Sequence, residues 1–98
     1  MDNNNLIWLC EWYKKNCNSD WEHNYGIKIE TLDNPGWALT IDIIGSTQEN
    51  LNNMPWRFIK KNNDDWYGYK IEDGKFEASG DALKLNQLIK LFRDIVEK

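Results

Sequence analysis

The feature that most constrains this chain is a two-residue turn signal, Asp73-Gly74, between two runs of alternating apolar and polar residues. Asp-Gly between such runs is typical of a tight β-hairpin. Folding back at this point pairs Glu72 with Lys75, Ile71 with Phe76, Lys70 with Glu77 and Tyr69 with Ala78. Opposite charges then meet on one face and apolar side chains on the other, which favours this register.

A second hairpin is predicted earlier in the chain, because residues 25–31 and 37–43 also alternate. A three-residue loop, Asn34–Gly36, would pair Ile29 with Ile41 on the inner, core face and Lys28 with Asp42 on the outer face. Residues 56–60 and 66–72 are expected to form two further strands, with the turn at residues 62–65 between them.

Helices are predicted at both ends of the chain. Residues 5–17 place Leu6, Cys10, Tyr13 and Cys17 on one side, with Trp8 and Trp12 on a neighbouring line. This helix is apolar over a wide arc, so we expect it to be largely covered, with the first side toward the core. Asp81 is the expected N-cap of a second helix that runs to about Glu97. Its core stripe is expected to contain Leu85, Leu88, Ile89, Phe92, Ile95 and Val96.

The order helix, about five antiparallel strands, helix predicts a single two-layer α+β domain over residues 1–98. Both helices need a partner for their apolar stripes, so both are expected to pack on one face of the sheet. The other face would then be open to solvent, as antiparallel sheets allow.

Charge is unevenly distributed along the chain, whose formal net charge is −4. Residues 20–49 carry six carboxylates and a single lysine. This argues against nucleic acid as a partner, since phosphates require a basic surface, and it favours a basic protein partner.

Three further features of the sequence indicate where in the cell the protein is expected. No apolar run is long enough for a membrane helix, and the start of the chain, Met1 to Asn5, lacks the basic flank of a secretory signal. Cys10 and Cys17, seven apart in one helix, are too distant for a disulfide. We therefore expect a cytoplasmic protein with reduced cysteines and no membrane partner.

Candidate sites are few. Asp20-Trp21-Glu22-His23 gathers two carboxylates and the only histidine, so an acid–base or metal site is one alternative, and a capping junction or a partner contact is another. No nucleophile or phosphate-binding loop stands out, and we assign no catalytic, cofactor or metal residue. On the open face, Trp66 beside Gly68 would make a docking platform. The residues predicted to contact a partner are Trp21, Glu22, His23, Glu30, Asp33, Asp42, Asp64, Asp65, Trp66 and Glu77.

Several segments together resemble the immunity protein 53 family. They are Trp12-Tyr13, Asp20-Trp21-Glu22-His23, Tyr25 to Ile29, Thr31 to Trp37, Ile41-Asp42, Asp65-Trp66, Glu72-Asp73 and Lys75-Phe76-Glu77. The resemblance implies an α+β immunity protein of a bacterial polymorphic toxin system that is not an enzyme and needs no cofactor. We expect it to neutralise a cognate toxin by occlusion through an acidic surface, and a basic nuclease would fit as the toxin. The alternatives are a small ligand- or peptide-binding domain and a metal-dependent enzyme built on Asp20, Glu22 and His23.

Overall fold

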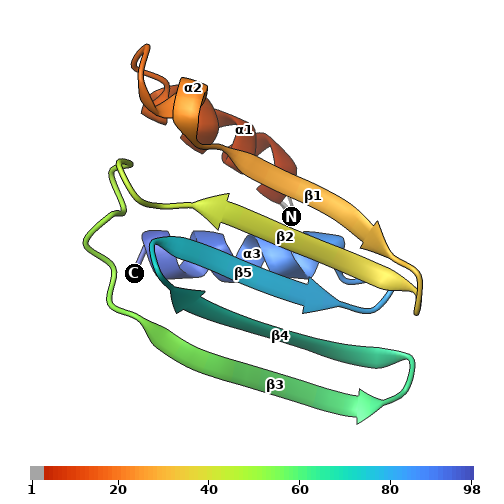
Figure 1. Cartoon of the computed structure of the whole chain (residues 1–98). Helices are drawn as coiled ribbons and strands as arrows, with labels where there is room; N and C mark the ends of the chain where they lie inside the picture. Colours follow the sequence, from red (N-terminus) through yellow and green to blue (C-terminus); the bar gives the residue numbers. More distant parts are fainter. Residues whose placement is uncertain (1–3) are drawn as a thin grey trace.

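A computed structural model describes residues 4–98 and contains three helices and five strands (Figure 1). The elements are α1 (Asn5–Asn16), α2 (Trp21–Asn24), β1 (Ile27–Leu32), β2 (Gly36–Asp42), β3 (Met54–Asn62), β4 (Asp65–Glu72), β5 (Lys75–Gly80) and α3 (Leu85–Val96). The strands form one antiparallel sheet in the order β1-β2-β5-β4-β3, with the helices on one side of it. The predicted α+β fold is therefore confirmed.

The β4–β5 hairpin has the predicted register, with Glu72 opposite Lys75, Ile71 opposite Phe76 and Tyr69 opposite Ala78. Its ion pairs differ from the prediction. Lys70 Nζ contacts Glu72 Oε1 along the same strand at 2.7 Å, and Lys75 Nζ contacts Asp42 Oδ1 on β2 at 2.7 Å. Because β5 lies between β4 and β2, Lys75 has a second strand from which to take its partner.

The β1–β2 hairpin has the predicted faces but a register displaced by two residues. Ile29 lies opposite Leu39 and Lys28 opposite Thr40, so the predicted pairs with Ile41 and Asp42 are wrong. The loop comprises residues 33–35, because Gly36 belongs to β2 and pairs with Leu32. Gly36 is suited to this place since a Cβ there would overlap the carbonyl oxygen of Gly80 on β5.

Helix α3 lies behind β2 and β5 and presents the predicted stripe to the sheet (Figure 1). Leu88, Ile89 and Phe92 are fully buried against the apolar face. The helix begins at Leu85, later than the predicted cap at Asp81. Asp81 instead accepts the backbone N–H of Leu83 at 2.9 Å and thereby stabilises the turn that precedes the helix.

Helix α1 buries a different side from the one predicted. Leu9 and Trp12 are buried, whereas Leu6 is 58% exposed, Tyr13 is 40% exposed and Cys10 is also exposed. The reason is that α1 packs mainly against α3, through Trp12 and Trp8, whose rings lie 5.0 and 5.9 Å from Phe92. The expectation of a largely covered helix is therefore wrong, and one apolar side of α1 faces solvent.

The short helix α2 was not predicted as a helix. It places Trp21 in the core, where the ring lies 5.7 Å from Trp12 and 5.7 Å from Tyr13. Two side chains hold the preceding loop. Asn18 Oδ1 accepts the N–H of Trp21 at 2.9 Å, and Glu22 accepts the N–H groups of Asn18 and Ser19, each at 2.8 Å.

Candidate protein-binding surface

Three aromatic side chains, which we call the open-face cluster, gather on the face of the sheet that no described helix covers. They are Trp56 and Phe58 from β3 and Trp66 from β4. Trp56 and Phe58 are 48% and 53% exposed, and Trp66 is half-buried. The Phe58 ring stacks on Trp56 with centroids 6.4 Å apart and lies 6.1 Å from Trp66. The three rings thus form one continuous apolar surface.

The backbone beneath the cluster explains its arrangement. Phe58 pairs with Gly68, and the Trp56 ring lies over Gly68, where a Cβ would overlap it. Glycine therefore allows an aromatic ring to lie flat against the strand. The sequence suggested Gly68 as a neighbour of Trp66, but the space above Gly68 is occupied by the Trp56 ring.

Asp81 fixes the other side of the cluster. Its Oδ2 accepts the backbone N–H of Trp66 at 2.9 Å, and its own N–H donates to the Trp66 carbonyl at 3.1 Å. Lys84 Nζ completes the junction with contacts of 2.8 Å to Asp81 and 2.7 Å to Asp65. Burial by itself would raise the pKa of Asp81, but the hydrogen bonds from Lys84, Leu83 and Trp66 outweigh it and lower the pKa to about 2.

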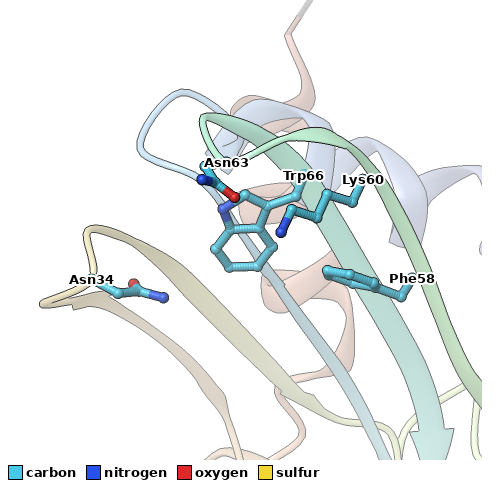
Figure 2. A pocket seen from close by; sticks show the side chains of 5 residues that line it. All are labelled: Asn34, Phe58, Lys60, Asn63 and Trp66. Carbon is cyan, nitrogen blue, oxygen red and sulfur yellow. The ribbon is translucent and has the colours of Figure 1, made fainter.

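A shallow hollow of about 250 Å³ adjoins the cluster at one end of the sheet. Figure 2 shows its lining, with Phe58, Lys60 and Trp66 beside one another and Asn34 approaching from the β1–β2 turn. Asn63 of the β3–β4 turn completes it. The hollow therefore lies between two hairpin tips, and each tip carries an exposed carboxylate, Asp33 next to Asn34 and Asp64 next to Asn63.

The charges of the open face are balanced. The strand register places four lysines and four carboxylates on it: Lys28, Lys60, Lys70, Lys75, Glu30, Asp42, Glu72 and Glu77. In the acidic segment 20–49, Glu22, Asp42 and Glu49 each accept a backbone N–H. Part of the negative charge in this segment therefore stabilises the local backbone.

The ten predicted partner-binding residues do not form one patch. Trp21, Glu22 and His23 lie on α2, whereas Asp33, Asp64, Asp65 and Trp66 lie near the hairpin tips at the other end of the sheet (Figure 1). Trp21 is only 1% exposed, so we correct its assignment from partner contact to core. The Glu22 carboxylate is engaged by the loop that precedes α2. Hydrogen bonds from backbone N–H groups, first that of Glu22 itself and then those of Asn18 and Ser19, lower its pKa.

The remaining predicted residues differ in how free they are. Asp42 is bonded to Lys75 and to the N–H of Gly26, and Asp65 is bonded to Lys84. The side chains that stay accessible are those of His23, Glu30, Asp33 and Asp64, with Glu77 and Trp66 partly so. Phe58 and Trp56 were not predicted, although two aromatics spaced by two in a strand must share a face.

Two further observations concern other kinds of site. Among residues 4–98, no three His, Cys, Asp or Glu side chains come close enough together to hold a metal ion. Over the same residues, no helix combines the length and the apolar character needed to cross a membrane.

Comparison with known protein families identifies the family of the chain. The family model of Immunity protein 53 covers residues 6–97, which is nearly the whole chain. No curated protein and no solved structure matches significantly. The resemblance noted in the sequence is thus confirmed, and the chain belongs to the immunity protein 53 family.

Proposed function

We propose that this chain is a cytoplasmic protein that binds and neutralises a cognate toxin of a bacterial polymorphic toxin system, one to one and without catalysis. The open-face cluster would be the centre of the contact, and the toxin would be inhibited because its working surface is covered. The observation that carries the proposal is a group of three adjacent aromatic rings, two of them exposed and the third half-buried, on a sheet face that no described helix covers.

Exposed aromatic side chains support this proposal for a physical reason. Tryptophan is enriched among the residues that dominate protein interfaces, because a large rigid ring buries much area at little cost in conformational entropy. The rings here are surrounded by charged and amide side chains, among them Lys60, Lys70 and Asn63. An apolar centre with a polar rim is the usual anatomy of a protein-binding surface.

Charge supports a basic partner. The net charge of −4 would steer a basic toxin toward the chain, and Asp33 and Asp64 beside the hollow would meet its lysines or arginines. A nuclease would present such a basic surface. Because the open face itself is balanced, we expect charge to affect the association rate more than the lifetime of the complex.

A small ligand- or peptide-binding domain is the alternative, and it would use the same hollow. With a volume of about 250 Å³ and wide access to solvent, the hollow is smaller than most ligand pockets. A broad protein contact would therefore bury more of the exposed aromatic surface than a small ligand in this hollow.

The test is to co-express the chain with the toxin domain encoded beside it, to score survival, and to measure the complex by calorimetry. Trp56→Ala and Phe58→Ala should each weaken binding by about 30-fold, the effect of removing an interface anchor worth about 2 kcal/mol. Ile7→Ala is the matched control, since Ile7 on α1 is 54% exposed and lies outside the cluster.

The outcomes separate the functions. Survival with a one-to-one complex that the two cluster variants weaken would support the proposal. Survival without a complex would indicate an enzyme acting on the toxin or on its damage. Tight binding that both cluster variants leave unchanged would refute the assigned surface.

A further inference from the structure

No described strand pairs with the outer edge of β1. β1 ends the sheet order, and Lys28, Ile29, Glu30 and Thr31 are all exposed. The carbonyl of Gly26 accepts the N–H of Asp42 on β2, so in an antiparallel ladder the even residues of β1 face β2. The N–H and C=O groups of Ile27, Ile29 and Thr31 therefore point away from the sheet, where another strand could bond them.

The two edges of the sheet differ in how they are protected. The other edge, β3, contains Pro55, basic side chains and two irregularities of register, between Met54 and Arg57 and between Lys60 and Asn62. Bulges, proline and edge lysines are the devices that prevent strand addition. β1 pairs with β2 without interruption from Ile27 to Leu32 and contains no proline. Its edge is therefore the one suited to a further strand.

We propose that a second copy of this chain adds to this edge, with the two β1 strands antiparallel about a two-fold axis at Ile29. In this register Ile29 exchanges both backbone hydrogen bonds with Ile29 of the second copy, and Ile27 does the same with Thr31. The sheets of the two copies then become continuous.

Charge selects this register among its neighbours. With the axis at Ile29, Lys28 lies opposite Glu30 of the second copy, and by symmetry the pair occurs twice. An axis at position 28 would set lysine against lysine, and an axis at position 30 would set glutamate against glutamate. Both side chains are well exposed, at 70% and 50%, so they are free to change partner from the 3.7 Å contact within the strand.

The helix side of the same edge is apolar, and no segment within residues 4–98 covers it. A groove of about 390 Å³ runs between α1 and β1, and its lining is mostly apolar. It is formed by Leu6, Leu9, Cys10, Tyr13, Gly26, Ile27 and Ile29. Across the two-fold axis the groove of each copy would adjoin that of the other, which gives the exposed side of α1 a partner.

Equilibrium sedimentation of the purified chain, from micromolar to millimolar concentration, tests the proposal. The mass should rise from 11.7 kDa toward twice that value. Lys28→Glu and Glu30→Lys should each weaken the dimer about tenfold or more, because each turns two attractions into repulsions. The double variant, which exchanges the charges, should restore the dimer.

Lys70→Glu is the matched control, because it reverses a lysine on the same face but on β4, away from the edge. In the dimer, hydrogen exchange should slow at the N–H groups of Ile27, Ile29 and Thr31. The N–H groups of Lys28 and Glu30, which already face β2, should change little.

A chain that stays monomeric throughout would overturn the proposal. A dimer that neither single variant weakens, or that the double variant fails to restore, would overturn the register. Neither result would affect the toxin-binding proposal, since the open-face cluster lies at the opposite edge of the sheet.

Discussion

Two aromatic clusters in this molecule use the same kinds of side chain in opposite ways. In the helical layer, Trp12 and Trp21 are 2% and 1% exposed. The Trp12 ring meets both Trp21 and Phe92 nearly edge to face. In the open-face cluster, Trp56 and Phe58 are about half exposed and are stacked. The ring types are alike, and only the surroundings differ.

The difference shows that the second layer decides the role of an aromatic residue. Helix α3 covers β2 and β5, and α1 packs on α3, so rings on that side fill a closed core. The open face has no such cover among the described residues. Its rings keep their apolar surface available to a partner.

Substitution of a tryptophan in each cluster should give the largest contrast. Trp12→Ala should lower the free energy of unfolding by about 3–5 kcal/mol, because it leaves a cavity in a closed core. Trp56→Ala should lower it by at most about 1 kcal/mol, since half of the ring is already in water. Urea unfolding followed by circular dichroism measures both values. Equal losses of unfolding free energy would contradict the distinction between a closed core around Trp12 and an open cluster around Trp56.

Asp81 links the buried part to the open-face cluster, and its removal should have the next largest effect. Asp81→Asn should cost about 2 kcal/mol at neutral pH, because charge-assisted bonds to Lys84 and Trp66 are weakened.

The effect of this substitution should depend on pH. The folded pKa of Asp81 is about 2, below its ordinary 3.8, so its stabilisation is present above pH 3.8 and is lost as the pH falls toward 2. The difference in unfolding free energy between wild type and Asp81→Asn should therefore shrink on acidification. A constant difference from neutral pH to pH 2 would contradict the assigned role.

Gly68→Ala tests whether the Trp56 ring needs the space above Gly68. The added Cβ would overlap the Trp56 ring and lie 2.9 Å from the carbonyl oxygen of Arg57, so we expect a loss of about 1–2 kcal/mol and weaker toxin binding. Gly26→Ala is the matched control, because a Cβ there meets no atom within 4 Å. Unfolding and calorimetry of both variants give the comparison.

Ile29→Ala should have only a small effect on stability. The sequence pattern predicts a core residue here, but Ile29 is 40% exposed, so in dilute, monomeric solution we expect a loss of about 1 kcal/mol. Leu39→Ala, at the fully buried position opposite, should cost about 2–5 kcal/mol. Similar losses at both positions would mean that β1 is covered.

Local patterns predicted the sheet well. The β4–β5 register follows from Asp73-Gly74 and the alternation on either side, because hairpin pairing depends on neighbouring residues. The β1–β2 register is displaced because two three-residue loops were compatible with the alternation. The close approach of Gly36 to Gly80, which favours the observed register, involves a strand far along the chain.

The helical layer and the candidate surface were predicted less well, because both depend on tertiary packing. The sequence shows a wide apolar arc on α1, but only the position of α3 decides that Trp12 is buried and Leu6 exposed. Trp66 was placed on the open face by its alternation with Tyr67. Phe58 and Trp56 join it only through the β3–β4 register, and the predicted turn at residues 62–65 does not fix that register as Asp73-Gly74 does for the next hairpin.

The central place of β5 also has a consequence for how the chain folds. Three of the four strand pairings join neighbours in sequence, and only β2–β5 joins distant segments. Since β5 is the last strand of the chain, the β1–β2 hairpin must wait for it before the sheet can close. We expect docking of β2 to limit the folding rate, so that Ile41→Val slows refolding while Ile27→Val mainly speeds unfolding. Stopped-flow kinetics measures both rates. If the N-terminal hairpin docks only after the rate-limiting step, Ile41→Val would instead mainly speed unfolding and leave the refolding rate nearly unchanged.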